Sequence, residues 1–140
     1  MELFLRGYTK EHSVLDGLAT LITALRNLND YESRGYDFLI GSPPYDKSGS
    51  TYKRWMMYLR WMVRKDAIDL GLWEGVDKRD LLIPLDTHTF QVSRRLGLLE
   101  RKTYDLKAVV ALTESLRRFD PEDPIRYDFA LYRIGQEKIV

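Results

Sequence analysis

The sequence predicts an all-α protein. In several stretches apolar residues recur at three- and four-residue steps, which is the period of an amphipathic helix. Glycine- and proline-rich turns separate these stretches. The one apolar run that could form a strand, residues 81–85, has no second strand candidate to pair with, so we interpret it as a buried connector. We therefore expect a compact helical bundle.

The composition is that of one ordinary soluble domain. A chain of 140 residues, 44% hydrophobic and 31% charged, can bury a single core. The absence of cysteine excludes disulfides, zinc–thiolate sites, iron–sulfur clusters and cysteine nucleophiles, and only two histidines are present, so we expect neither a metal nor a cofactor. No apolar run approaches the roughly 18 residues that span a bilayer, and the N-terminus does not resemble a signal peptide. We expect a cytoplasmic protein that does not enter a membrane.

The first third of the chain is expected to hold one helix. Residues 1–12 would form a docked arm or the remnant of an earlier helix. The next segment, 13–30, has a helical apolar pattern, and Ser13 with Asp16 three places on resembles a capping box. Residues 33–50 are rich in turn formers and predict a long loop, and long loops are often functional.

A strongly basic helix is predicted over residues 51–65. Four basic residues and no acidic one lie between Thr51 and Arg64. Lys53, Arg60 and Arg64 are spaced so that they share one stripe of the helix. This stripe is either a solvated basic face or a surface that contacts phosphate groups, and the pattern alone leaves both open.

Three further helices are predicted, over residues 86–97, 105–119 and 124–135. Asp86 is suited to cap the N-terminus of the first, and Gly97 to terminate it. Including the arm and the loop, the expected organisation is a single domain over residues 1–140.

Two stretches resemble known families. Residues 85–97, LDTHTFQVSRRLG, resemble the segment that carries the catalytic aspartate in the helix–hairpin–helix DNA glycosylase superfamily, the group that contains endonuclease III. A closer resemblance, over residues 42–135, is to an uncharacterised bacterial family distantly related to those glycosylases. It is carried by KR at 53–54, LRWMVR at 59–64, DLGLW at 69–73, FDPEDP at 119–124 and YDFAL at 127–131. The chain resembles the C-terminal half of that family, which implies either that it is a fragment or that a partner chain or a second copy supplies missing helices.

The resemblance implies a base-excision repair glycosylase with abasic-site lyase activity, acting on DNA without a cofactor. Asp86 would be the catalytic aspartate and Lys53 the lysine that forms a Schiff base. The glycosylase hairpin motif is missing before Lys53, where the sequence reads KSGS. The residues expected to contact DNA are Ser48, Gly49, Arg54, Trp55, Arg60, Arg64 and His88.

Each of these candidates also has a structural interpretation. Asp86 can be a simple helix cap, which is worth about 1 kcal/mol. Lys53 can be a surface lysine, His88 a hydrogen-bonded structural histidine, and Trp55 a packing residue. At the level of function, the alternatives are a non-catalytic DNA-binding module and a helical interaction domain that completes a larger bundle.

Overall fold

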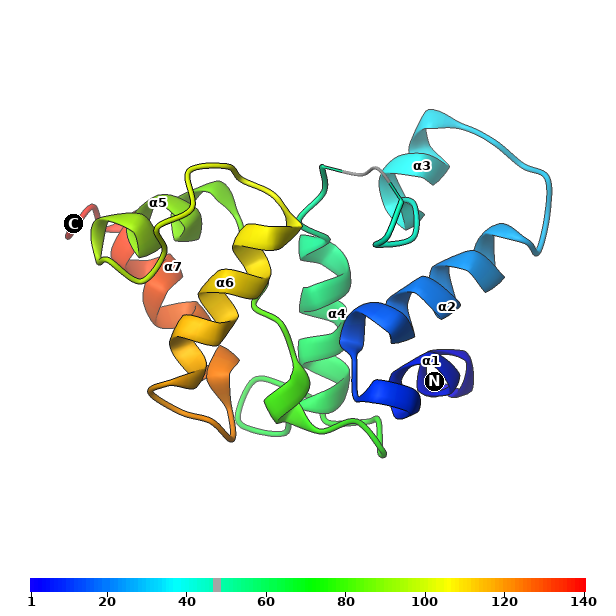
Figure 1. Ribbon diagram of the computed structural model, residues 1–140, viewed down its shortest axis with the longest axis horizontal. Helices are drawn as coiled ribbons and strands as arrows, with labels where there is room; N and C mark the ends of the chain where they lie inside the picture. Colours follow the sequence, from blue (N-terminus) through cyan, green and yellow to red (C-terminus); the bar gives the residue numbers. More distant parts are fainter. Residues whose placement is uncertain (47–48) are drawn as a thin grey trace. The chain divides into compact units, whose positions relative to one another are not determined.

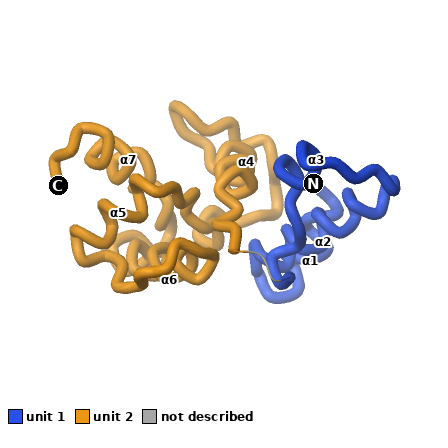
Figure 2. The backbone as a smooth tube through the Cα atoms, turned by 90° about the horizontal axis from the view of Figure 1, so that it is seen from above, with its two compact units in different colours: residues 1–48 blue, residues 49–140 orange. Residues whose placement is uncertain are grey.

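The computed structural model describes residues 1–46 and 49–140, and its secondary structure is helical (Figure 1). The described residues form no strand, only an isolated bridge between Lys65 and Leu70, so the predicted all-α class is confirmed. None of their helices is long and apolar enough to cross a bilayer. The length predicts one domain, whereas the structure consists of two compact units, Met1–Ser48 (unit 1) and Gly49–Val140 (unit 2) (Figure 2).

Unit 1 is built on a close pair of helices, α1 (Glu2–Glu11) and α2 (Val14–Arg26). Ser13 accepts a hydrogen bond from the backbone N–H of Asp16, as its capping role predicts. Two glycines permit the close packing: a Cβ on Gly7 would lie 2.3 Å from the Asp16 carbonyl oxygen, and one on Gly17 would lie 2.6 Å from the ring of Phe4. Large apolar side chains fill this interface, namely Phe4, Tyr8, Leu18 and Ile22.

The structure decides between two alternatives for one segment of unit 1 and contradicts the prediction for another. Residues 1–12, expected to form a docked arm or the remnant of a helix, contain helix α1, which buries Phe4 and Tyr8 one turn apart. The expected loop over residues 33–50 contains helix α3 (Arg34–Ile40), which begins where the Ser33 side chain accepts a hydrogen bond from the backbone N–H of Tyr36. Helix α3 buries none of its residues, and for that reason its apolar pattern is weak.

Unit 2 contains four α-helices and two short 3₁₀ helices. They are α4 (Lys53–Val63), η1 (Lys78–Asp80), α5 (Thr87–Arg95), α6 (Leu106–Arg117), η2 (Pro124–Tyr127) and α7 (Asp128–Gln136). The helices predicted over 51–65, 86–97 and 105–119 are present within a few residues of their expected ends, whereas the one predicted over 124–135 begins as the 3₁₀ helix η2.

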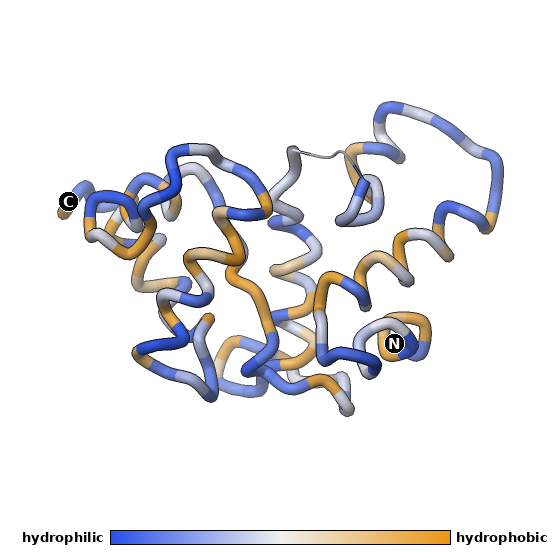
Figure 3. The backbone as a smooth tube through the Cα atoms, viewed as in Figure 1, coloured by the Kyte–Doolittle hydropathy of each residue, from blue (hydrophilic) through white to orange (hydrophobic). Residues whose placement is uncertain are grey.

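The core of unit 2 forms around the apolar connector, residues 81–85. All five of its residues are buried, and the connector is among the most hydrophobic parts of the backbone in Figure 3. It forms no strand, and the backbone N–H of Ile83 donates to the hydroxyl of Thr113 in α6 at 3.1 Å. This bond matters because a buried backbone donor without a partner would destabilise the fold. The connector delivers the chain directly to Asp86 at the start of α5.

Candidate functional site

Lys53 and Asp86 lie side by side in unit 2. The Lys53 Nζ atom donates to Asp86 Oδ2 at 3.3 Å, although the two residues are far apart in sequence. Lys53 is the first residue of α4 and Asp86 is the N-cap of α5, so the pair forms where two helices begin. The Lys53 side chain is 42% exposed and that of Asp86 13%, which leaves the amine accessible from solvent.

Asp86 uses its two oxygens for different purposes. Oδ1 accepts a hydrogen bond from the backbone N–H of Thr89 at 2.8 Å, which caps α5, and Oδ2 accepts from Lys53. Burial raises the pKa of Asp86, but the Thr89 hydrogen bond and the Lys53 ammonium together hold it below its ordinary value. Asp86 is therefore ionised at neutral pH. The predicted cap is confirmed, and the second oxygen remains directed at Lys53.

A shared carbonyl oxygen fixes the backbone on both sides of this pair. The Leu85 carbonyl, which immediately precedes Asp86, accepts hydrogen bonds from the Thr51 hydroxyl at 3.2 Å and from the Tyr104 hydroxyl at 2.8 Å. Thr51 stands two residues before Lys53. The ring of Tyr104 also packs edge-on against Phe90 in α5, with centroids 5.5 Å apart. These contacts hold the first residues of α4 and α5 together.

Tyr52 adopts a left-handed backbone conformation next to Lys53. Its φ is 53°, a region that bulky residues rarely occupy, and its side chain is buried. The Ser50 hydroxyl accepts the Tyr52 N–H at 3.0 Å. Backbone strain of this kind persists only where surrounding contacts impose it, and such positions concentrate at functional sites.

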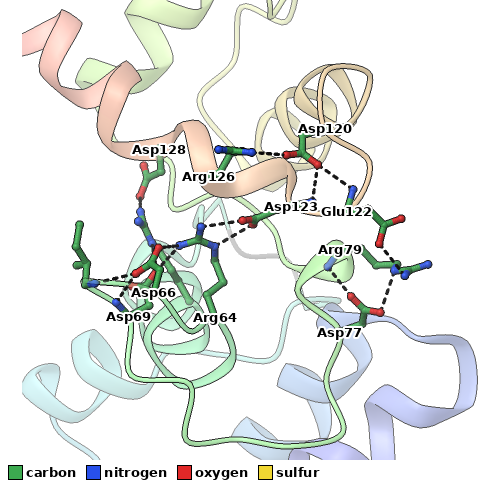
Figure 4. A network of polar contacts seen from close by, with 12 residues as sticks. Arg64, Asp66, Asp69, Asp77, Arg79, Asp120, Glu122, Asp123, Arg126 and Asp128 are labelled. Carbon is green, nitrogen blue, oxygen red and sulfur yellow. Dashed lines mark hydrogen bonds and ion pairs between the residues drawn. The ribbon is translucent and has the colours of Figure 1, made fainter.

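Arg60 and Arg64 do not form the solvated basic face that the sequence left open. Their side chains are only 4% and 8% exposed. Arg64 makes a two-pronged pair with Asp123, at 2.9 and 2.8 Å, and also contacts Asp66 and Asp69 (Figure 4).

Arg60 pairs with Asp69 at 3.1 Å and with Asp128. We call the ion pairs that Arg60 and Arg64 form with Asp66, Asp69, Asp123 and Asp128 the charged seam. The guanidinium groups of Arg60 and Arg64 face carboxylates of unit 2, so this geometry does not support phosphate contact by either residue.

The other predicted residues are divided between the surface and the packed interior. Arg54 and His88 are exposed near the starts of α4 and α5, and Gly49 is exposed with open space around it. Trp55 is half-buried and packs edge-on against Tyr58, with centroids 6.1 Å apart. Ser48 lies outside the described residues.

Sequence reasoning missed several contributors to this site, namely Thr51, Tyr104 and Asp128. A signal existed for Asp128 alone, because it belongs to the YDFAL motif at 127–131. The hydroxyl groups of Thr51 and Tyr104 donate hydrogen bonds to the Leu85 carbonyl, which belongs to another segment. No local sequence pattern predicts such contacts.

The fold and site define an all-α protein with an accessible lysine–aspartate pair at the junction of two helix N-termini. The chain belongs to the family described as a protein of unknown function (DUF2400), whose model matches residues 1–137. No curated protein and no solved structure matches the chain.

Proposed function

We propose that this protein acts on DNA as a base-excision glycosylase with abasic-site lyase activity, in which Lys53 is the nucleophile and Asp86 the essential carboxylate. One observation carries the proposal: the Lys53 amine lies 3.3 Å from the Asp86 carboxylate and is open to solvent. If Lys53 were only a surface lysine, an ion pair with Asp86 would not be needed. If Asp86 were only a helix cap, its contact with Thr89 would be sufficient.

Base excision coupled to strand cleavage uses a carboxylate and an amine, which Asp86 and Lys53 would supply. Cleavage of an N-glycosidic bond passes through a positively charged, oxocarbenium-like sugar, which a nearby carboxylate stabilises. Asp86 is suited to this role because its low pKa keeps it ionised. The Lys53 amine, once it has given up a proton, attacks C1′ as the base departs, and opening of the sugar ring then yields a Schiff base. Elimination from that intermediate breaks the DNA strand.

The surroundings of the pair support a polyanionic ligand. Arg54 and His88 are exposed within the first turns of the same two helices. Helix N-termini favour negative charge, and an arginine beside them, here Arg54, adds to the attraction for phosphate. Because Arg54 and His88 are exposed whereas the seam arginines are buried, we assign DNA contact to Arg54 and His88, with Trp55 as an aromatic neighbour.

Borohydride trapping tests the proposal. The chain is incubated with duplex DNA that contains an abasic site, and sodium borohydride reduces any Schiff base to a stable covalent adduct. We expect an adduct for the wild-type chain and none for Lys53→Ala, while Lys107→Ala, which removes an exposed lysine in α6, should trap like the wild type. Absence of a wild-type adduct, or an adduct of equal yield with Lys53→Ala, would refute the lyase mechanism.

A helical interaction domain is the second candidate, because large apolar side chains are exposed in each unit. In unit 1 they include Leu28, Phe38 and Leu39, and in unit 2 Ile68, Leu70 and Leu72. Exposed apolar clusters often mark association sites. Sedimentation equilibrium separates the two candidates: self-association without an adduct favours the interaction domain. Salt-dependent DNA binding without an adduct favours a non-catalytic DNA-binding module.

A further inference from the structure

The Leu85 carbonyl oxygen joins three segments of unit 2 directly beside the Lys53–Asp86 pair. Tyr104, in the connection between α5 and α6, donates to this oxygen at 2.8 Å, and Thr51 donates to it at 3.2 Å. The two hydroxyl oxygens lie 3.3 Å from each other. Because Leu85 and Thr51 are buried, the carbonyl needs a hydrogen-bond donor from the protein, and these two hydroxyl groups supply it.

The contact between Lys53 and Asp86 is too weak to hold the two helix starts in place by itself. The paired atoms are 3.3 Å apart, and the Lys53 side chain is 42% exposed. Water screens such a pair and the freedom of the side chain opposes it, which is why exposed ion pairs add little stability. The position of the amine relative to the carboxylate must therefore be set by the backbone that carries each residue.

The carbonyl network fixes that backbone very close to both residues of the pair. Leu85 immediately precedes Asp86, and Thr51 stands two residues before Lys53, the first residue of α4. Tyr104 reaches the same oxygen from a third segment, and so ties the starts of the two helices together. This matters for a reaction, because a misplacement of the reacting groups by about 1 Å can slow it about 100-fold.

We propose that Tyr104 is a positioning residue: through the Leu85 carbonyl its hydroxyl group holds the starts of α4 and α5 so that the amine and the carboxylate of the candidate site face each other. Its ring is also anchored, because it packs edge-on against the buried Phe90 in α5, with the centroids 5.5 Å apart. Tyr104 acts through the backbone and does not need to touch the substrate. Its importance for the reaction rests on the proposed function of Lys53 and Asp86, whereas its effect on the two helix starts does not.

Amide hydrogen exchange of the chain without DNA tests the effect on the helix starts. The first backbone bonds of the two helices run from the Met56 N–H to the Tyr52 carbonyl and from the Phe90 N–H to the Asp86 carbonyl, each at 2.9 Å. Tyr104→Phe removes the hydroxyl group and keeps the ring. We expect exchange at both amides to be about 2- to 10-fold faster than in the wild type, the factor that corresponds to one hydrogen bond. Unchanged exchange, or an equal increase throughout unit 2, would overturn the proposal.

Tyr132→Phe is the matched control, because it also removes a tyrosine hydroxyl group from unit 2. That hydroxyl accepts a hydrogen bond from Gln136 within α7, at 2.8 Å, so the control should leave exchange at Met56 and Phe90 unchanged. A control that speeds exchange at these amides as much as Tyr104→Phe does would refute a specific role for Tyr104.

Thr51 provides a second test, because it donates to the same carbonyl oxygen as Tyr104. Thr51→Val removes this donor, whereas Thr51→Ser keeps a hydroxyl group and should exchange like the wild type. Each single variant leaves one donor on the Leu85 carbonyl. Removal of both, in Tyr104→Phe with Thr51→Val, should therefore speed exchange by more than the product of the two single effects. A double variant that equals this product would count against a shared acceptor.

The trapping assay tests the importance of Tyr104 for the reaction. With protein in excess over abasic DNA, the trapping rate at saturation reports the geometry of the reacting groups, and the half-saturating protein concentration reports DNA binding. We expect Tyr104→Phe to lower the saturated rate by about 10-fold, and to change the half-saturating concentration by less than about 2-fold. An equal loss in binding would make Tyr104 a DNA contact and overturn the positioning role.

The outcomes for Tyr104 and for the proposed function are separable. If the wild type forms no adduct, the glycosylase proposal fails, and hydrogen exchange alone decides whether Tyr104 holds the helix starts. If the wild type forms an adduct and Tyr104→Phe traps at the same rate, the lyase mechanism stands and the positioning inference fails.

Discussion

The two ends of helix α4 carry similar cations in very different surroundings. At its start, Lys53 meets a single carboxylate and keeps 42% of its side-chain surface exposed. Towards its end, Arg60 and Arg64 are buried and held by two and three carboxylates. One stripe of positive charge in the sequence thus becomes a partly exposed lysine at one end and a buried seam of ion pairs at the other. What separates them is the number of acidic partners that other segments supply.

The largest expected effect comes from breaking the seam. Arg64→Ala would leave the buried Asp123 without its cation and Asp69 with Arg60 alone, and removal of one partner from a buried pair typically costs about 3–5 kcal/mol. We expect a loss of this size in the free energy of unfolding, measured by urea denaturation followed by circular dichroism. Arg79→Ala is the control, because Arg79 pairs with Glu122 on the exposed surface, and such pairs contribute about 0–1 kcal/mol. Equal losses in the two variants would show that the seam does not stabilise unit 2.

The next effect separates the two roles of Asp86. Asp86→Ala removes the cap of α5 and should lower the free energy of unfolding by about 1 kcal/mol. Asp86→Ser keeps an oxygen that can accept from the Thr89 N–H but removes the negative charge beside Lys53. We therefore expect near-wild-type stability for the serine variant together with loss of borohydride trapping. If the serine variant traps normally, Asp86 is only a cap.

A smaller effect appears in acid. The backbone N–H groups of Asp69 and Ile68 donate to Asp66, and with Arg64 they lower the pKa of Asp66 to about 2. The unfolded value is near 3.9, so this carboxylate contributes stability that is present above about pH 4 and lost as pH falls through 2. Asp66 is partly solvated, which screens the effect. Urea midpoints measured from pH 5 to pH 2 should fall less steeply for Asp66→Asn than for the wild type, whereas parallel curves would contradict the assignment.

Much of this comparison was visible in the sequence, and the rest depends on tertiary contacts. Apolar periodicity predicted helices at α2, α4 and α6, because each buries a continuous face, and the cap residue Asp86 and the stop at Gly97 predicted α5. It did not predict α3, which buries none. The Lys53–Asp86 pair was predicted by resemblance and is present as a contact. The seam was not predicted, because Arg60 and Arg64 meet Asp128 and Asp123 only after the last third of the chain folds back onto α4.

The smallest expected effect on stability, that of Lys53→Ala, tests whether the two ends of α4 have different roles. Lys53→Ala breaks an ion pair whose cation is partly exposed, and surface pairs contribute about 0–1 kcal/mol. Asp86 would keep its hydrogen bond from the Thr89 backbone N–H, so its charge is not left without a partner. We expect a change of less than about 1 kcal/mol in the free energy of unfolding, measured beside Arg64→Ala under the same conditions. A loss as large as that of Arg64→Ala would place Lys53 in the seam, and the loss of trapping in this variant could then reflect unfolding. A small loss together with abolished trapping would mean that Arg60 and Arg64 stabilise the fold whereas Lys53 acts in the reaction.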